Sequence, residues 1–295
     1  MRRMITRQAK QTLVALTLLA GLWACSPSNT PQPIPTIPPP TPTIKATFTP
    51  SPVPTPTPLG CLTQPGHVEQ GVLQTTKPPQ EYLIYLPPCY DRRADLRYPV
   101  LYLLHGQTYI DDQWIRLGAV STADRLILSG DVLPFIMVFP DDRYWNLPTG
   151  ASFGDRLIND LIPYIDQTYR TLPDRQHRAL GGLSRGGGWT VRLGLTDWQL
   201  FGTLGLHSPA IFTDDSAYIS KWIAAIPPES WPRLWLDVGD QDSELGSSRV
   251  FENLLASYEF PHEFHLYTGA HTEEYWSAHV GEYIRWYVQG WQPQP

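Results

Sequence analysis

The chain has 295 residues, of which 42% are hydrophobic and 12% are aromatic, and its formal net charge is −6 at pH 7. These values are typical of a soluble globular protein with one large domain or two small ones. The acidic balance argues against nucleic acid as a partner, because proteins that bind phosphate backbones carry a basic surface.

The first 24 residues are typical of an export signal. Four basic residues precede an apolar run, Thr12–Ala24, that is too short to span a membrane. The run ends in Leu22-Trp23-Ala24-Cys25, which resembles the lipobox of bacterial lipoproteins. Lipoprotein signals are cleaved before the cysteine, which is then acylated. The resemblance therefore implies a lipid anchor at Cys25, and plain secretion is the alternative.

Residues 25–59 consist mainly of proline, threonine and serine. Proline removes backbone donors and there is little apolar surface to drive collapse, so an extended spacer is expected. The folded domain is predicted to span residues 60–295, which is long enough for one core. Cys61 and Cys89 are the two remaining cysteines. In an exported chain they are expected to form a disulfide rather than a metal site.

Short apolar runs alternate with longer helical patterns along this domain. The predicted strands are Val68–Thr75, Tyr82–Leu86, Val100–Leu104, Phe135–Phe139, Arg178–Leu183, Thr203–Leu206, Leu234–Val238 and Glu263–Tyr267. The predicted helices are Asp112–Ser129, Gly154–Tyr169, Gly186–Leu195, Ser216–Ile226, Glu244–Tyr258 and Glu274–Val288. Pro163 should kink or end the second helix.

Strands that alternate with helices imply parallel pairing through right-handed crossovers. The first two strands have no helix between them and should form an antiparallel edge. The predicted fold is therefore one α/β domain, with a mostly parallel open sheet and helices on both faces. In such sheets ligands bind beyond the carboxyl ends of the strands, so polar residues that directly follow strands deserve the closest inspection.

The segment Gly182-Leu183-Ser184-Arg185-Gly186 follows a predicted strand and opens a predicted helix. It matches the G-x-S-x-G nucleophile elbow, in which the serine occupies a strained corner and the glycines let strand and helix approach closely. The helix N-terminus would add positive potential. A flexible turn is the alternative interpretation.

The strand Val100–Leu104 ends in His105-Gly106-Gln107. A loop here can supply one main-chain N–H of an oxyanion hole, and the residue after the nucleophile supplies the other. Gln107 and Arg185 are the predicted donors. His105 precedes Ser184 in the chain and is expected to fix the loop.

Three aspartates compete for the role of a carboxylate that orients a catalytic histidine. Asp237 alternates with apolar neighbours inside a strand and is expected to be structural, whereas Asp240 and Asp242 lie in the following loop. A calcium site is a further alternative, although the spacing of an EF-hand loop is missing.

His271 follows the last predicted strand in a glycine-containing loop. It completes the chain order Ser…Asp…His that accompanies the G-x-S-x-G nucleophile elbow. His279 is predicted to lie on the last helix, and His262 and His265 beside or within the last strand. His207 is the rival, but it precedes the acidic candidates and is expected to line the pocket instead.

The domain resembles the esterase family within the α/β-hydrolases. The resemblance rests on six segments: "YPVLYLLHG", "FPD", "LIPYID", "GGLSRGG", "GDQD" and "GAHTEEYW". That family includes esterase D, feruloyl esterases, enterochelin esterases and mycolyltransferases. The resemblance extends from about Tyr82 to the end of the chain. It implies an α/β-hydrolase fold with Ser184, Asp242 and His271 as the triad, and it alone separates Asp242 from Asp240.

The predicted activity is hydrolysis of a carboxylic ester, with acyl or feruloyl groups on sugars as candidate substrates, and it needs no metal or cofactor. An acyltransferase and a non-catalytic binding module are the alternatives. Five aromatic residues lie in or beside loops that follow strands, where they could stack on sugars or phenolic acids or simply pack: Trp114, Tyr144, Trp145, Trp189 and Trp276. Arg143 and Arg185 could attract an anionic group or pair with aspartates. The sequence says nothing about the oligomeric state.

Overall fold

The computed structural model describes residues 60–146 and 152–291. The predicted signal peptide, Cys25 and the spacer at residues 25–59 lie outside the described residues. No helix within the described ranges is both long enough and apolar enough to cross a membrane.

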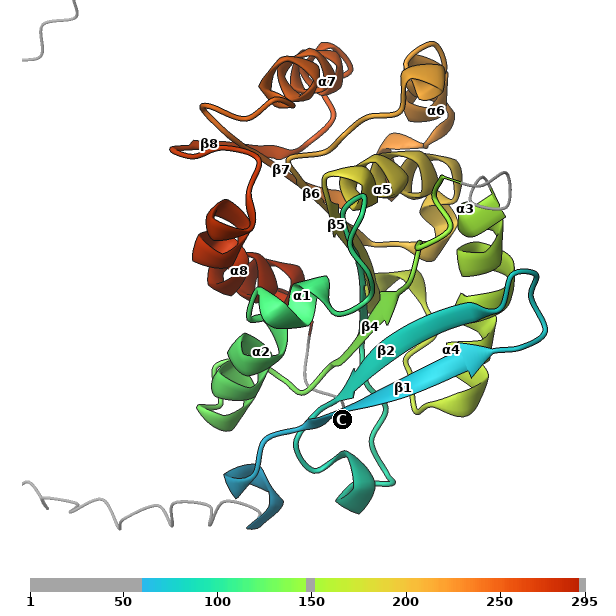
Figure 1. Cartoon of the computed structure of the whole chain (residues 1–295), viewed down its shortest axis with the longest axis vertical. Coiled ribbons are helices and arrows are strands. Elements are labelled where there is room, and N and C mark those ends of the chain that lie inside the picture. The colour runs from blue at the N-terminus through green and yellow to red at the C-terminus, as the bar shows by residue number, and fades with distance from the viewer. Residues whose placement is uncertain (1–59, 147–151, 292–295) are drawn as a thin grey trace, which may run out of the picture. The chain divides into compact units, whose positions relative to one another are not determined.

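An eight-stranded sheet forms the centre of the domain (Figure 1). Its strand order is β1-β2-β4-β3-β5-β6-β7-β8. β1 pairs antiparallel with β2, and β2 pairs antiparallel with β4, whereas all later neighbours are parallel. The predicted antiparallel edge and parallel centre are both confirmed. The strands are β1 His67–Leu73, β2 Gln80–Leu86, β3 Val100–Leu104, β4 Ile136–Pro140, β5 Arg178–Leu183, β6 Thr203–His207, β7 Arg233–Gly239 and β8 Glu263–Tyr267.

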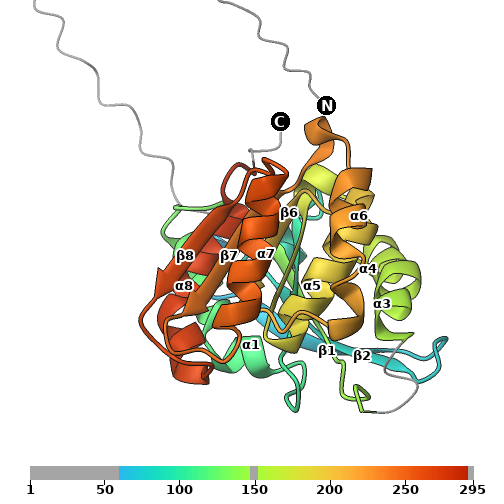
Figure 2. The same ribbon diagram turned by 90° about the horizontal axis from the view of Figure 1, so that it is seen from above.

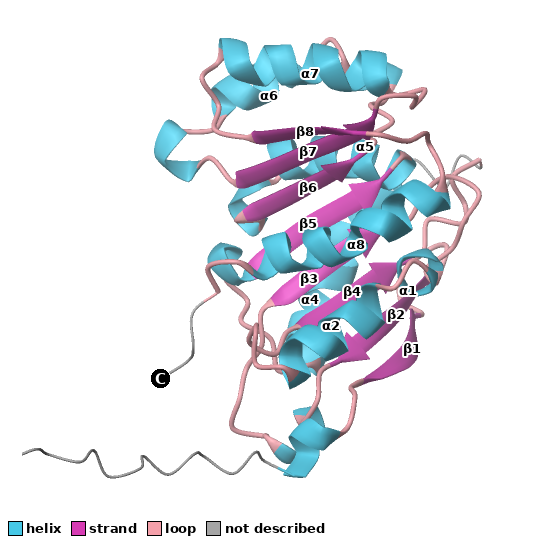
Figure 3. Cartoon of the chain, turned by 90° about the vertical axis from the view of Figure 1, so that its left-hand side faces the viewer, coloured by secondary structure: helices cyan, strands magenta, loops and turns pink. Residues whose placement is uncertain are grey.

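Helices cover both faces of the sheet (Figures 2 and 3). The helices are α1 Gln113–Arg116, α2 Ala119–Leu128, α3 Phe153–Arg156, α4 Ile162–Thr168, α5 Arg185–Thr196, α6 Ile219–Ala225, α7 Leu245–Ser257 and α8 Glu273–Val288. One buried cluster contains α1, α2 and α8, and the other contains α3 to α7. Side chains alternate across a strand, so Tyr102 of β3 joins one cluster and Leu101 and Leu103 join the other.

Two predicted helices differ from the structure. The predicted helix Asp112–Ser129 is broken into α1 and α2 by Gly118, whose φ of 103° only glycine adopts without strain. Pro163 does not end the second helix. The helical segment continues from Phe153 to Thr168, and a π-helical turn at Leu157–Leu161 interrupts the regular α-helical hydrogen bonding just before the proline.

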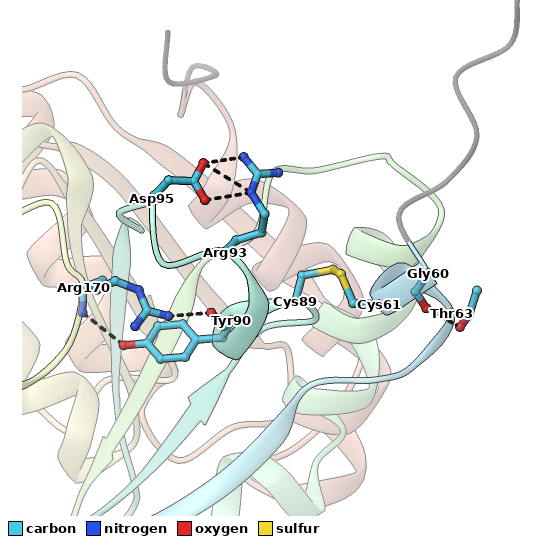
Figure 4. Close-up of a disulfide and its surroundings, with 8 residues drawn as sticks. All are labelled: Gly60, Cys61, Thr63, Cys89, Tyr90, Arg93, Asp95 and Arg170. Carbon is cyan, nitrogen blue, oxygen red and sulfur yellow. Dashed lines mark hydrogen bonds and ion pairs between the residues drawn. A yellow bond between two sulfur atoms is a disulfide. The ribbon is translucent and has the colours of Figure 1, made fainter.

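The predicted disulfide is confirmed: Cys61 and Cys89 are bonded, with Cα atoms 5.1 Å apart (Figure 4). It joins the start of the described domain to the segment that follows β2. Tyr90, the next residue, is held by Arg170, whose guanidinium lies 3.8 Å from the centre of the Tyr90 ring and donates to the Tyr90 carbonyl at 2.5 Å. The bridge is therefore attached to the body of the domain.

Candidate active site

Ser184 stands at the sharp turn between β5 and α5. Its φ is 52° and its ψ is −121°, a strained conformation for a residue with a Cβ. A Cβ at Gly182 would lie 2.3 Å from main-chain atoms of Gly186, and one at Gly186 would lie 2.2 Å from the Leu104 carbonyl oxygen. Both positions therefore require glycine because of close approach. The predicted strand–turn–helix context of the G-x-S-x-G segment is present.

The structure brings Ser184, Asp242 and His271 together. The Ser184 hydroxyl lies 2.8 Å from His271 Nε2, and His271 Nδ1 lies 2.9 and 3.1 Å from the two carboxylate oxygens of Asp242. The His271 side chain is 26% exposed, whereas that of Asp242 is fully buried. The imidazole thus connects a buried carboxylate to a hydroxyl at the carboxyl end of the sheet.

Several hydrogen bonds hold Asp242 in its ionised form. Burial by itself would raise the pKa of this carboxyl, but hydrogen bonds from His271, the Glu244 main chain and the Ser208 side chain outweigh burial and lower the pKa below its ordinary value. The charge stabilises a protonated His271, as an acid–base histidine requires.

The other two aspartates of this segment lie elsewhere. Asp240 accepts a hydrogen bond from the Gly269 main chain and is exposed. Asp237 is completely buried and accepts hydrogen bonds from the hydroxyls of Tyr275 and Tyr283, which confirms its structural character. Within the described ranges, no three His, Cys, Asp or Glu side chains meet as a metal site would require.

Both predicted oxyanion donors lie beside Ser184. Arg185 is the first residue of α5, where a main-chain N–H has no acceptor within the helix. Gln107 follows the buried residue Gly106, at which a Cβ would lie 3.5 Å from the Ser184 Cβ. Among the described residues, the Gln107 N–H has no hydrogen-bond acceptor. The N–H groups of Gln107 and Arg185 therefore stay the predicted oxyanion donors near Ser184.

A groove of about 480 Å³ opens beside these two residues. Its walls contain both proposed donors, aromatic and aliphatic side chains, and charged groups at the edge. The lining residues are Gln107, Trp145, Arg185, Trp189, Arg192, Ala210, Ile211, Phe212, Thr213 and Asp214. Trp145 and Phe212 are partly exposed, so their rings are accessible to a ligand.

Most of the aromatic residues singled out from the sequence are packing residues. Trp114, Trp189 and Trp276 are at most 3% exposed, and only Tyr144 and Trp145 keep accessible surface. The two arginines pair with carboxylates, as one of the alternatives predicts. Arg185 Nε donates to Asp142 at 2.9 Å, and Arg143 pairs with Asp141 and Glu81.

His207 does not line the pocket, so that expectation is wrong. It is completely buried at the end of β6, where Nδ1 lies 2.5 Å from Asp237 and Nε2 lies 2.8 Å from the Tyr287 hydroxyl. Its ring stacks on Tyr283 with centres 3.8 Å apart. Both ring nitrogens of His207 have hydrogen-bond partners inside the core, so β6 can extend to include this residue. His262, His265 and His279 lie before β8, in β8 and in α8, as predicted.

His105 fixes its loop, as predicted. It is 4% exposed, and it contacts the Gly106 carbonyl through Nδ1 and the Asp142 main chain through Nε2, each at 2.7 Å.

Sequence reasoning missed three polar residues that surround the site. Gln113 accepts from the Gly106 N–H at 2.8 Å and reaches Glu273, just after His271. Ser208 accepts from Trp276, whose ring lies edge-on to His271. Asp142 accepts from Arg185. Asp142 and Ser208 do follow strands, and that position was the available signal.

Three comparisons with known proteins agree with this geometry. A curated relative, an "Endo-1,4-beta-xylanase/feruloyl esterase" of Xylanibacter ruminicola, is 30% identical over 205 residues, which are 65% of this chain and 27% of the relative. An esterase of Mycobacterium tuberculosis is 24% identical over 64% of this chain and 51% of its own length. The chain therefore spans about a quarter and about half of these relatives. A solved "ferulic acid esterase" is 25% identical with a TM-score of 0.68, over 77% of this chain and 99% of that structure.

The family profile described as "Putative esterase" matches residues 74–286, which include helices α1 to α7, most of α8 and strands β2 to β8. The likeness of the solved structure extends over nearly the whole of that chain, so the domain has the α/β-hydrolase fold. The chain belongs to this esterase family.

Proposed function

We propose that this protein is a serine esterase in which Ser184, His271 and Asp242 form the catalytic triad. The observation that carries the proposal is the continuous contact from the Ser184 hydroxyl through both ring nitrogens of His271 to Asp242. In this arrangement the imidazole can take the hydroxyl proton while the carboxylate holds the tautomer and stabilises the imidazolium.

The reaction then proceeds in two stages. Ser184 Oγ attacks the ester carbonyl while His271 Nε2 accepts its proton, and the carbonyl oxygen takes the negative charge between the N–H groups of Gln107 and Arg185. Collapse of this intermediate expels the alcohol, protonated by His271, and leaves an acyl-enzyme. Water repeats the steps at the acyl carbonyl and releases the acid.

The proposed substrate is an ester between an aromatic acid of the feruloyl type and a carbohydrate. Support comes from the names of the relatives and from the groove next to Arg185, where the partly exposed ring of Trp145 offers a face for stacking. Pairing of Arg185 with Asp142 reduces its attraction for a free anion, so a neutral ester fits this groove better than an acidic one.

We further propose that the protein is exported and held at a membrane through Cys25. The disulfide Cys61–Cys89 supports the export, because such bonds persist in oxidising compartments. A Cys25→Ser variant should move from the membrane fraction to the medium, as followed by immunoblotting of both fractions. Equal membrane retention of the variant and the parent would refute the anchor.

The triad is tested by replacing the nucleophile. Ser184→Ala should lower kcat for an aryl ester by about 10⁴-fold or more, because the acyl-enzyme cannot form. It should also abolish labelling by a fluorophosphonate probe, whereas Ser216→Ala, at an exposed serine, should keep both. Full turnover by Ser184→Ala would refute the proposal.

Acyl transfer to a sugar or lipid hydroxyl remains the alternative outcome of the same acyl-enzyme. Product analysis with an added alcohol would distinguish the two. A dominant free acid supports hydrolysis, and a dominant new ester supports transfer.

A further inference from the structure

The two proposed oxyanion donors come from loops that have no direct chain connection. Gln107 follows β3 and Arg185 follows β5. Stabilisation of an oxyanion depends on donors that are already in position before the charge develops. A residue that holds both loops would therefore influence catalysis without touching the substrate.

The direction of the Gln107 N–H is set by the peptide group that it shares with Gly106. The carbonyl of Gly106 accepts hydrogen bonds from His105 Nδ1 at 2.7 Å and from the Tyr109 N–H at 3.3 Å. This peptide bond is trans, so its N–H points opposite to its carbonyl. Holding the Gly106 carbonyl therefore fixes the direction of the Gln107 N–H.

His105 can hold that carbonyl only in one tautomer. The main-chain N–H of Asp142 lies 2.7 Å from His105 Nε2, and a main-chain N–H can only donate. Nε2 is therefore the acceptor, and the neutral ring carries its hydrogen on Nδ1, where the Gly106 carbonyl needs it. Asp142 thus selects the tautomer.

The carboxylate of the same residue contacts the other donor loop. Asp142 Oδ2 accepts from Arg185 Nε and from Trp189 Nε1, each at 2.9 Å. These two residues lie one helical turn apart at the start of α5, directly after Ser184. Asp142 follows β4, and its side chain is only 5% exposed.

We propose that Asp142 is a positioning residue that holds the two oxyanion donors in register, through its main chain on the Gln107 side and its carboxylate on the Arg185 side. This inference rests on the proposed function, since it assumes that the two N–H groups stabilise the tetrahedral intermediate. Burial raises the pKa of Asp142 above its ordinary value, although the charge of Arg185 and the hydrogen bond from Trp189 act to lower it. Ionisation of the Asp142 carboxyl is therefore less favourable than in water.

The matched control is a second arginine–aspartate pair at the same groove. Arg192 donates to Asp215 through Nε and Nη2 at 2.6 to 3.0 Å, and its guanidinium also lies against Trp189 and Phe212. The Asp215 side chain is 6% exposed. This pair makes no hydrogen bond to Asp142 or to the Gly106–Gln107 segment, so Asp215→Asn removes a similar charge at a similar depth and leaves the hydrogen bonds of Asp142 in place.

The experiment compares Asp142→Asn with Asp215→Asn in steady-state hydrolysis of p-nitrophenyl butyrate and in inhibition by phenylboronic acid, which forms a tetrahedral adduct on an active serine. Asp142→Asn should lower kcat about 10- to 100-fold with KM within about threefold, because the donors are displaced rather than deleted. Its affinity for the boronic acid should fall by the same factor as kcat/KM. Asp215→Asn should stay within about threefold of the parent in kcat and boronate affinity.

Equal boronate affinity of Asp142→Asn and the parent would overturn the inference, and so would equal losses in the two variants. Failure of the boronic acid and of a fluorophosphonate to react with the parent would instead refute the proposed function.

A second variant covers the case in which Asp142→Asn does not fold. Arg185→Met keeps the main-chain donor and removes the side-chain hydrogen bond to Asp142, while the methionine side chain can still pack against Trp189 and Phe212, so it should show the same selective loss of kcat and boronate affinity. The double variant should lose no more than the larger single loss, because both act through one interaction. Parental boronate affinity in Arg185→Met, or additive losses in the double variant, would overturn the inference.

Discussion

Two histidine–aspartate pairs lie near the carboxyl end of the sheet, and their surroundings differ in one decisive respect. In the first pair, His271 contacts Asp242 at 2.9 Å and the histidine side chain is 26% exposed. In the second pair, His207 contacts Asp237 at 2.5 Å and both side chains are fully buried. The first pair presents its Nε2 to Ser184 Oγ, and the second presents its Nε2 to a buried tyrosine hydroxyl.

The buried pair is surrounded by donors that satisfy its charge. Asp237 accepts from Trp235 as well as from Tyr275 and Tyr283. Burial, together with the negative charge of Asp237, raises the pKa of Tyr275 and Tyr283 far above the ordinary range, so these phenols remain donors at any working pH. A histidine beside an aspartate therefore indicates an acid–base site only when the other ring nitrogen faces a reactive group that a ligand can reach.

The largest expected effect is on turnover. His271→Ala should lower kcat by about 10⁴-fold or more while the melting temperature stays within about 2 °C of the parent, since the residue removed is partly exposed. Aryl ester kinetics and a thermal melt measured on the same sample check both halves. A parental kcat, or unfolding of the variant, would contradict the assignment of His271 to catalysis rather than to stability.

The next effect is on stability. His207→Ala removes one partner of a buried pair and should reduce the free energy of unfolding by about 3–5 kcal/mol. Urea unfolding measures this loss. Enzyme that remains folded at low temperature should keep kcat within about tenfold. A parental stability, or a loss of turnover equal to that of His271→Ala, would show that the two pairs are not separate in function.

The smallest effect concerns pH. The pKa of Asp242 is lowered in the folded protein, so its contribution to stability is present above about pH 4 and is lost as the pH falls through its folded pKa. The deficit of Asp242→Asn in unfolding free energy should therefore be largest at neutral pH and should shrink below about pH 4. Urea midpoints between pH 3 and 7 measure it, and a constant deficit would contradict the assigned direction.

Much of the fold follows from local pattern. The bounds of β3, β5 and β8 match their predicted ranges to the residue, because a short apolar run ends at a polar or glycine-containing loop in each case. The end of β6 was missed by one residue. His207 is polar, and its burial is explained by contacts with Asp237 on the neighbouring strand and with Tyr283 and Tyr287 of α8.

The residues of the candidate site also differ in how much of their role can be predicted from local sequence. Ser184 and His271 each carry a local signature and fit the chain order, so they could be selected from the sequence, whereas only the family resemblance separates Asp242 from Asp240. Gln113 carries no such signal and Asp142 carries only its place after a strand, because their importance arises from contacts between segments that are up to 160 residues apart. Distances of this kind exist only after the sheet has assembled.

The disulfide also determines how the domain bears mechanical load. β1 is an edge strand that pairs only with β2, so tension applied at His67 would peel it away one hydrogen bond at a time. Tension that enters the chain before Gly60 reaches Cys61 first and passes through the covalent bond to Cys89, behind the β1–β2 hairpin. The hairpin is thereby shielded from tension that is applied at the N-terminal end of the described domain.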